Sequence, residues 1–467
     1  MESNASINDK QQVLPGIPVA IPVGDKEGSA PKEGAPACKS AERLRTPQRL
    51  QTEMRVCCPD DLVAEAHPVR AVAKAVAKLD LSQFYEPIKA REGVHGRDAT
   101  APELLVGLWL YATIRGIGSA RELARRCQES RPFEWLCGGV SVNHRMLSEF
   151  RTGHGAGLDD LLTQMVATLV DKEVVKASRI SQDGVRVRVG AGASSFRREQ
   201  RLEQLLEEAQ QHVQELKRQV DSPAATTKRQ AAVRKRVAQE RLRRVEAAIQ
   251  QLPELKKRQE EAAKKAGQGK AGQKIREKQP RVSTTDAEAR VMKMGNGGFN
   301  PAVNVQVATD TESRAIVAIA VTNEGSDSAG LSEPMRQQVE ERTGSKVEQH
   351  LLDGGYMRTA DIEQAHQQGV EVYVPPKSAR NPEKRGRELE PKPGDSEAIR
   401  AWKQRMASEK GKQIYKQRAS TSETVNADLR KRGLTQILVR GLAKAKCVAL
   451  WCALAYNMMH FSAVLLS

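Results

Sequence analysis

Cysteine is scarce in this 467-residue sequence, and the few cysteines follow no recognisable pattern. There are seven, at positions 38, 57, 58, 127, 137, 447 and 452, with no CxxC pair. An odd number at these spacings excludes both a disulfide framework and a zinc site. The opening MESNASINDKQQ also lacks the basic and apolar regions of a secretion signal. We therefore expect a cytoplasmic protein with buried, reduced thiols.

Long apolar runs are also rare. The run CVALWCALAYNMMHFSAVLLS at the C-terminal end approaches the length of a membrane span, but Asn457 and His460 interrupt it and Lys444 and Lys446 precede it. The uninterrupted part is shorter than the ~20 residues that a span needs. We predict a helix buried in a core and no membrane partner.

Negative charge is in short supply. The formal charge is +17 and the pI is about 9.6, which favours polyanionic partners, most often nucleic acid, over the alternative of an inert basic surface. Residues 375–446 carry 19 Lys and Arg against 8 Asp and Glu, and residues 196–280 carry 22 against 12. The excess of positive charge in these two stretches is larger than the net charge of the whole chain. A hydrophobic fraction of 39% suffices for a sizeable core and two or three domains.

The N-terminal part divides into a tail and a helical region. Residues 1–50 are rich in Pro, Gly, Ser and Lys without periodicity, which predicts a disordered tail. Residues 51–170 form the predicted helical domain, because apolar residues recur there at spacings of three and four. Within it, Thr100 is expected at a helix cap before Pro102 and Glu103.

The segment from Ser119 to Gly153 predicts a helix-turn-helix-like pair. Ser119 opens the first helix, the break falls at Pro132 or at the two glycines 138–139, and Ser141 or Asn143 opens the second. Such a pair places its second helix in the DNA major groove. The candidate DNA-binding residues are the two arginines of the second helix that we expect to be exposed, Arg145 and Arg151.

Residues 196–280 return to helical periodicity. Two apolar stripes, one from Leu202 to Val220 and one from Val233 to Leu252, are separated by DSPAATT. They predict an antiparallel helical hairpin, followed by a flexible basic tether over 256–280. The hairpin has three open interpretations: a dimer contact, a DNA-backbone clamp or a spacer.

The remaining segments, 171–195 and 281–467, predict a mixed α/β sheet. Alternating valines 185, 187 and 189 indicate a first strand with Asp183 at its start, and two β-branched runs around Asp310–Ser313 indicate a hairpin. A strand, a Gly-Gly turn, a helix and another strand follow from Lys346. The order describes a mixed sheet interrupted by the helical insertion.

Three carboxylates stand out by position. Asp183 lies at the edge of the first strand, Asp353 follows the run HLL where α/β sheets place their sites, and Glu423 lies on a basic helix near Tyr415 and Arg418. Magnesium prefers such oxygen ligands, and two ions can serve phosphoryl transfer. Asp286 and Asp310 are rivals, each also explained by a local turn.

These residues resemble bacterial insertion-sequence DDE transposases with an RNase H-like core. SQDGVRVRVGAGASSFRR resembles the segment of the first catalytic Asp, LLDGGYM that of the second, and YKQRASTSETV the Tyr-Arg-Glu signature; AYNMMHF is similar to the terminal helix. The resemblance implies that Asp183, Asp353 and Glu423 bind two Mg²⁺ ions, with Mn²⁺ as a possible substitute. It further implies that Tyr415, Arg418 and Arg430 contact transposon-end DNA, and that the helical region helps to bind the terminal inverted repeats.

Two departures from the signature affect these roles. Four residues separate Arg418 from Glu423 where three is commoner, and a helix register shifted by one residue would turn Arg418 away from the site. Arg430 replaces Lys. The resemblance implies DNA cleavage at transposon ends and strand transfer into target DNA, by a homo-oligomer on DNA in the bacterial cytoplasm, associated with the nucleoid. The alternatives are a catalytically inactive relative that only binds DNA and an RNase H-like nuclease that joins no strands.

Overall fold

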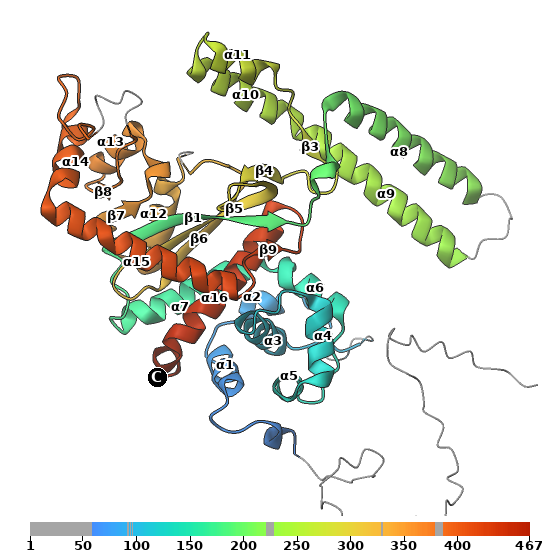
Figure 1. Ribbon diagram of the computed structural model, residues 1–467. Coiled ribbons are helices and arrows are strands. Elements are labelled where there is room, and N and C mark those ends of the chain that lie inside the picture. The colour runs from blue at the N-terminus through green and yellow to red at the C-terminus, as the bar shows by residue number, and fades with distance from the viewer. Residues whose placement is uncertain are drawn as a thin grey trace, which may run out of the picture. The chain divides into compact units, whose positions relative to one another are not determined.

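Strands from residues 179 to 437 form a seven-stranded mixed sheet (Figure 1). The computed structural model describes residues 58–467 apart from 91–92, 94, 96, 221–227, 328–329 and 379–385. The strand order is β4-β5-β1-β7-β8, with β6 paired to β5 and β9 paired to β1. The strands are β1 (Arg179–Val189), β4 (Arg290–Lys293), β5 (Phe299–Asp310), β6 (Ile316–Thr322), β7 (Gln349–Leu352), β8 (Glu371–Tyr373) and β9 (Gln436–Ile437). The predicted tail, residues 1–50, lies outside the described residues.

Strand β1 is the centre of this sheet. It runs antiparallel to β5, with Asp183 opposite Val307, and parallel to β7 and β9. The strand begins at Arg179, so the expectation that Asp183 stands at its start is wrong. Because successive side chains alternate between faces, Asp183 and Val185 share one face while Gln182 and Gly184 belong to the other.

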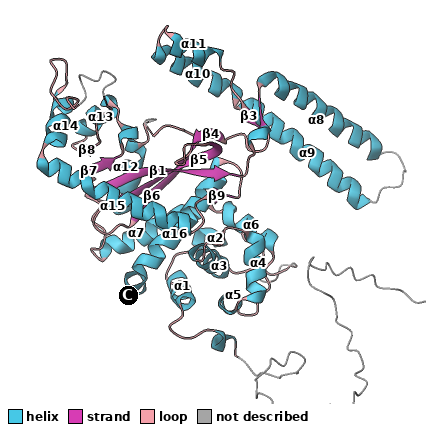
Figure 2. Cartoon of the chain, viewed as in Figure 1, coloured by secondary structure: helices cyan, strands magenta, loops and turns pink. Residues whose placement is uncertain are grey.

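Helices make up the N-terminal part, as predicted (Figure 2). Ser119 and Asn143 accept backbone N–H groups at the starts of α4 and α6, which confirms both as caps. Of the two predicted break positions, the glycines 138–139 separate α5 from α6, whereas Pro132 lies in the first turn of the extra helix α5. Helix α3 is preceded by Ala101 rather than capped by Thr100. The elements are η1 (Pro59–Leu62), α1 (Pro68–Val76), α2 (Ser82–Tyr85), α3 (Pro102–Ile114), α4 (Ala120–Glu129), α5 (Arg131–Cys137), α6 (His144–Gly153) and α7 (Gly155–Asp171).

The insertion after β1 contains the predicted hairpin. Helices α8 (Glu199–Val220) and α9 (Lys228–Gln250) pack together, but Val233 and Val237 are exposed, and the buried side of α9 is formed by Ala238, Val245 and Ala248. The predicted flexible tether is also wrong, since that segment folds into α10 (Leu252–Ala266) and α11 (Lys270–Glu277). The short elements η2 (Ala193–Ser195), β2 (Phe196–Arg197) and β3 (Val282–Ser283) flank these helices.

The C-terminal part completes the α/β arrangement. Helix α15 lies against β1 and β7, and α16 against β5 and β6, whereas Leu331 before α12 accepts a hydrogen bond from Gln182 on the opposite face. The elements are α12 (Ser332–Thr343), η3 (Gly354–Tyr356), α13 (Thr359–Gln367), α14 (Glu397–Ala407), α15 (Glu409–Lys431) and α16 (Leu442–Leu466).

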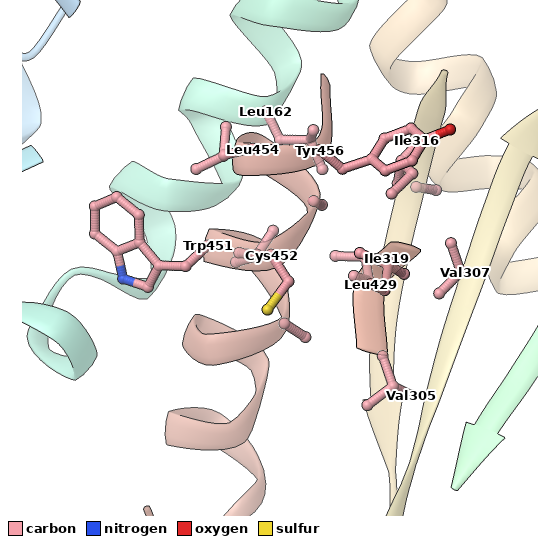
Figure 3. Close-up of a cluster of buried hydrophobic side chains, with 14 of the residues drawn as sticks. Leu162, Val305, Val307, Ile316, Ile319, Leu429, Trp451, Cys452, Leu454 and Tyr456 are labelled. Atoms are coloured by element: carbon pink, nitrogen blue, oxygen red, sulfur yellow. The ribbon is translucent and has the colours of Figure 1, made fainter. Parts of the chain in front are cut away.

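Helix α16 is the core helix that its sequence predicts. By length and composition it could cross a membrane, but 61% of its most apolar 18-residue stretch is buried inside the protein. It contacts α1, α3, α6 and α7 as well as the sheet, and Figure 3 shows its side chains between Leu162 of α7 and Val305 and Val307 of β5. Asn457, which interrupts the apolar run, accepts from the backbone N–H of Ile316 (3.0 Å) and donates to its carbonyl (2.9 Å).

Four of the described cysteines are buried free thiols, at 127, 137, 447 and 452, as predicted. Cys58 is exposed. Cysteines 38 and 57 lie outside the described residues.

Replacing Asn457 tests the tie between α16 and β6. Asn457→Leu keeps the volume but leaves the buried N–H and C=O of Ile316 unpaired, which we expect to cost about 2–4 kcal/mol of unfolding free energy in urea titrations. The neighbouring change Met458→Leu, at a buried apolar position, is the control and should cost less than about 1.5 kcal/mol. Equal losses for the two variants would contradict the assigned role.

Candidate active site

The candidate site lies where one edge of β1 is open. Strand β7 pairs with β1 only as far as Gln182, and β9 joins it from Arg188 onward. Asp183 lies just after the first of these pairings, and Asp353 directly follows β7, at the strand end predicted from the sequence. The ladder therefore brings the two aspartates to the same opening.

Arg418 connects the two aspartates. Its Nη2 lies 3.4 Å from Asp183 Oδ1 and 3.9 Å from Asp353 Oδ1. The side chain of Arg418 is 14% exposed, that of Asp183 22% and that of Asp353 52%. One guanidinium thus compensates two carboxylates that would otherwise repel each other.

Asp183 is further held by hydrogen bonds. Its Oδ2 accepts from Asn426 Nδ2 of α15 (2.8 Å), and its Oδ1 accepts from the backbone N–H of Gly184 (3.0 Å). Burial raises the pKa of the Asp183 carboxyl, the Arg418 guanidinium opposes this rise, and the nearby carboxylates of Asp353 and Asp327 add to it. The site therefore concentrates negative charge in a partly desolvated place.

Glu423 does not join this pair. It is exposed on α15, and no hydrogen bond or ion pair involves its side chain among the residues that the structure describes. Ser422, one residue earlier, faces the sheet instead, with its hydroxyl 2.7 Å from that of Ser181. The shifted register therefore acts opposite to our expectation: Arg418 points into the site and Glu423 does not.

Glu423 nevertheless lies close to the opening along the helix. It precedes Asn426 by three residues, and side chains three apart are neighbours on a helix surface. Because Asn426 contacts Asp183, Glu423 lies beside the site on the solvent side. Arg430, seven residues after Glu423, is also exposed.

Asp327 is a carboxylate near the site that the sequence did not reveal. It accepts from Asn304 Nδ2 (2.7 Å), Gln306 Nε2 (3.2 Å) and Arg186 Nη2 (3.0 Å). A side chain at position 184 would collide with the Asp327 carboxylate, and one at position 355 would lie 3.5 Å from it. The glycine inside β1 was the available signal, because a strand glycine often marks close approach by another group.

The two rival aspartates have structural roles. Asp286 is buried and accepts from the backbone N–H groups of Glu288 and Gly441, before α16. Asp310 accepts from the N–H groups of Ala177 and Ser313 at the hairpin turn. Both carboxylates are thus used in local backbone bonding away from the opening.

The expected DNA-contacting residues differ in exposure. Arg145 is exposed on α6 and pairs with Glu149. Arg151 is buried, with its guanidinium over the ring of Trp109 and a bond to the carbonyl of Gly118, so its predicted exposure is wrong. Tyr415 is half-buried, and burial raises its pKa.

The donor set at the opening fits a magnesium ion. Mg²⁺ is typically held by one or two carboxylates together with water and substrate phosphates, and the Asp183 and Asp353 carboxylates already share one cationic group, that of Arg418. Within the described part of the chain, no group of three or more His, Cys, Asp or Glu side chains is arranged to hold a metal ion. Two of the three expected ligands are therefore together, and the third is not.

Comparison with known families decides the relationship. Residues 58–153 match a family model described as Transposase domain (DUF772), and residues 256–458 match one described as Transposase DDE domain. The chain belongs to the insertion-sequence DDE transposases. The DDE match implies an RNase H-like core for the sheet. No curated protein and no solved structure matches the chain.

The matched ranges cover this transposase unevenly. Helices α4 to α6 lie in the first range, and Asp353 and Glu423 lie in the second. Asp183 and the α8–α9 hairpin fall between the two ranges. The placement of Asp183 in the site therefore rests on its contacts with Arg418 and Asn426.

Replacing Arg418 tests whether it competes with a bound cation. Arg418→Gln should tighten Mn²⁺ binding on the order of tenfold, because a unit charge about 4 Å away is worth about 1 kcal/mol or more even in water. Binding is measured by calorimetry on the DNA-free protein. Arg430→Gln, on the same helix but exposed, is the control. Unchanged or weaker Mn²⁺ binding by Arg418→Gln would contradict the competition.

Proposed function

We propose that this transposase catalyses metal-dependent cleavage of DNA at transposon ends and strand transfer into target DNA. The observation that carries the proposal is the pair Asp183 and Asp353 at the open edge of β1, joined through Arg418. The family relationship supports DNA as the substrate. The transposase would act as a homo-oligomer on DNA in the bacterial cytoplasm, associated with the nucleoid.

The acidic residues of the chain would hold the metal. Asp183 and Asp353 would bind Mg²⁺ through their carboxylates, and Glu423 would supply a further carboxylate from its position one turn before Asn426. Two Mg²⁺ ions, or Mn²⁺ in their place, would polarise the scissile phosphodiester and lower the barrier to in-line displacement. Asn426 and the Gly184 N–H keep the Asp183 carboxylate oriented, and Asp327 supports the backbone at Gly184 from the other side.

The basic and aromatic side chains along α15 would position the DNA. Tyr415 and Arg418 lie beside the carboxylates, and Arg430 extends the same helix toward solvent. Phosphate contacts of this kind fix the register of a duplex without reading its sequence. Reading of the inverted repeats falls to α6, where Arg145 is the exposed arginine.

One observation favours a second candidate, a catalytically inactive transposase-derived DNA-binding protein. Glu423 is exposed and makes no contact with Asp183 or Asp353 in the described structure. A protein that lacks the third ligand would keep its basic surface and lose the phosphoryl transfer. An assay of nicking against binding separates the two candidates.

Neutralising the acids tests the catalytic proposal. Asp183→Asn, Asp353→Asn and Glu423→Gln should each lower nicking of an end-containing duplex in Mg²⁺ or Mn²⁺ by about a hundredfold or more, since metal assistance is worth several kcal/mol. Binding of the same duplex in gel shifts should remain. Glu409→Gln, an exposed glutamate that pairs with Lys412 at the start of α15, is the control. Wild-type protein that shifts the duplex without nicking it would favour the inactive candidate.

Arg145 tests the DNA-reading role of α6. Arg145→Ala should reduce the preference for transposon-end DNA over random duplex by about 1–3 kcal/mol, the range of one good base contact. Competition binding measures the ratio. The exposed Arg121 of α4, changed to alanine, is the control; a preference equally sensitive to both changes would argue against base reading by Arg145.

A further inference from the structure

A large cleft separates the insertion from the edge of the sheet. Its volume is about 1120 Å³, and it is lined by α10, α11, the segment 278–281, β2 and β4. Six cationic side chains and one acid, Glu277, line it; the cations are Arg198, Arg258, Lys274, Lys278, Arg281 and Arg290.

Four of these cations are uncompensated. Arg258 pairs with Glu254 and Glu324, and Arg290 donates to Gln251 and to backbone carbonyls. The other four, at positions 198, 274, 278 and 281, are exposed and have no ion pair or side-chain hydrogen bond with any residue that the structure describes. Clustered charges of one sign repel each other, so the cleft is suited to a polyanion.

Apolar groups accompany the charges. Phe196 lines the cleft, as does Val291, which is 50% exposed. On the adjoining β4–β5 hairpin, Phe299 is 69% exposed and pairs in register with Lys293. The cations are distributed over α10, α11, β4 and the segments that connect them to β2 and β3. Separate cations with apolar side chains among them suit an extended phosphodiester chain with its sugars better than a single small phosphate.

We propose that this cleft binds the backbone of duplex DNA, which makes the insertion a DNA-binding element separate from α6 and from the carboxylates. The proposal rests on the proposed function only in taking DNA as the partner. It assigns a backbone clamp to a part of the insertion other than the α8–α9 hairpin, for which the three interpretations were given. Helices α10 and α11, rather than the α8–α9 hairpin, provide its lining.

The cleft is connected to the candidate active site through one loop. Arg258 pairs with Glu324, and the Glu324 carbonyl accepts from Asn304 Nδ2, which also donates to Asp327. DNA held in the cleft would therefore contact Arg258, whose partner Glu324 belongs to the loop before α12. This loop places Asp327 against Gly184, beside Asp183.

The test removes three uncompensated charges. The variant Arg198→Gln/Lys278→Gln/Arg281→Gln is compared with Arg218→Gln/Arg234→Gln/Arg236→Gln, which removes three exposed arginines from the α8–α9 hairpin. Binding of a labelled random-sequence duplex is measured by anisotropy at several salt concentrations. Each lost phosphate contact makes the negative slope of log K against log salt shallower by about 0.9. The slope of the cleft variant should therefore be shallower than that of the wild type by up to about 2.7. The control variant should keep the wild-type slope.

Two results would overturn the proposal. One is an unchanged slope for the cleft variant, and the other is an equal fall for both variants, which would report general charge rather than a site. Thermal unfolding of each variant shows that the fold is intact. A nicking assay at low salt and saturating protein separates the two proposals. If the wild type nicks DNA and the cleft variant binds DNA normally, only the proposal about the cleft is refuted. If the wild type binds DNA but does not nick it, only the proposal about catalysis is refuted.

Discussion

The burial of α16 is the constraint on which the rest of the structure depends. This helix is apolar on nearly every side, so it has to be covered, and it is covered by the N-terminal helices on one side and by β5 and β6 on the other. Burying an asparagine in such a helix is costly unless every polar atom is paired, and the backbone of Ile316 supplies both partners. The same burial joins the helical region that carries α6 to the sheet that carries the carboxylates in one continuous core.

The candidate site differs from this core, because its buried and half-buried charged groups are only partly compensated. Three carboxylates, Asp183, Asp327 and Asp353, lie near one another at the open edge of β1. Arg418 and Asn426 compensate the first and third, and Arg186 and two amide donors compensate Asp327. Compensation by a single guanidinium shared between two carboxylates is incomplete, because each ionised carboxylate can accept several hydrogen bonds. Such a site has a net attraction for additional cations, which is the electrostatic requirement of metal-dependent phosphoryl transfer.

Much of this arrangement could be predicted from the sequence, and the failures have physical causes. Periodicity located the helical hairpin, the buried terminal helix and the strand end at Asp353, because burial patterns are local. The prediction that Arg151 is exposed was wrong because its burial depends on Trp109 and Gly118, which come from α3 and the turn that follows it. The prediction of a flexible tether was wrong because the Lys-rich and Gly-containing composition of residues 256–280 hid the apolar position there that α10 buries, Ala263. Asp327 was missed because its partners, Asn304 and Gln306, meet it only through the sheet.

The register of α15 limits how Glu423 can reach the other acids. Ser422 is held against Ser181, Asn426 against Asp183, and Arg418 against both aspartates, so rotation of the helix would break contacts at three successive turns. Val425 and Leu429 of the same helix are fully buried, and turning them outward would add the loss of their apolar burial. Motion of the Glu423 side chain costs far less, since an exposed glutamate changes rotamer freely. In the proposed active site, the third carboxylate would therefore be brought to the metal by its own side chain, with α15 remaining in place.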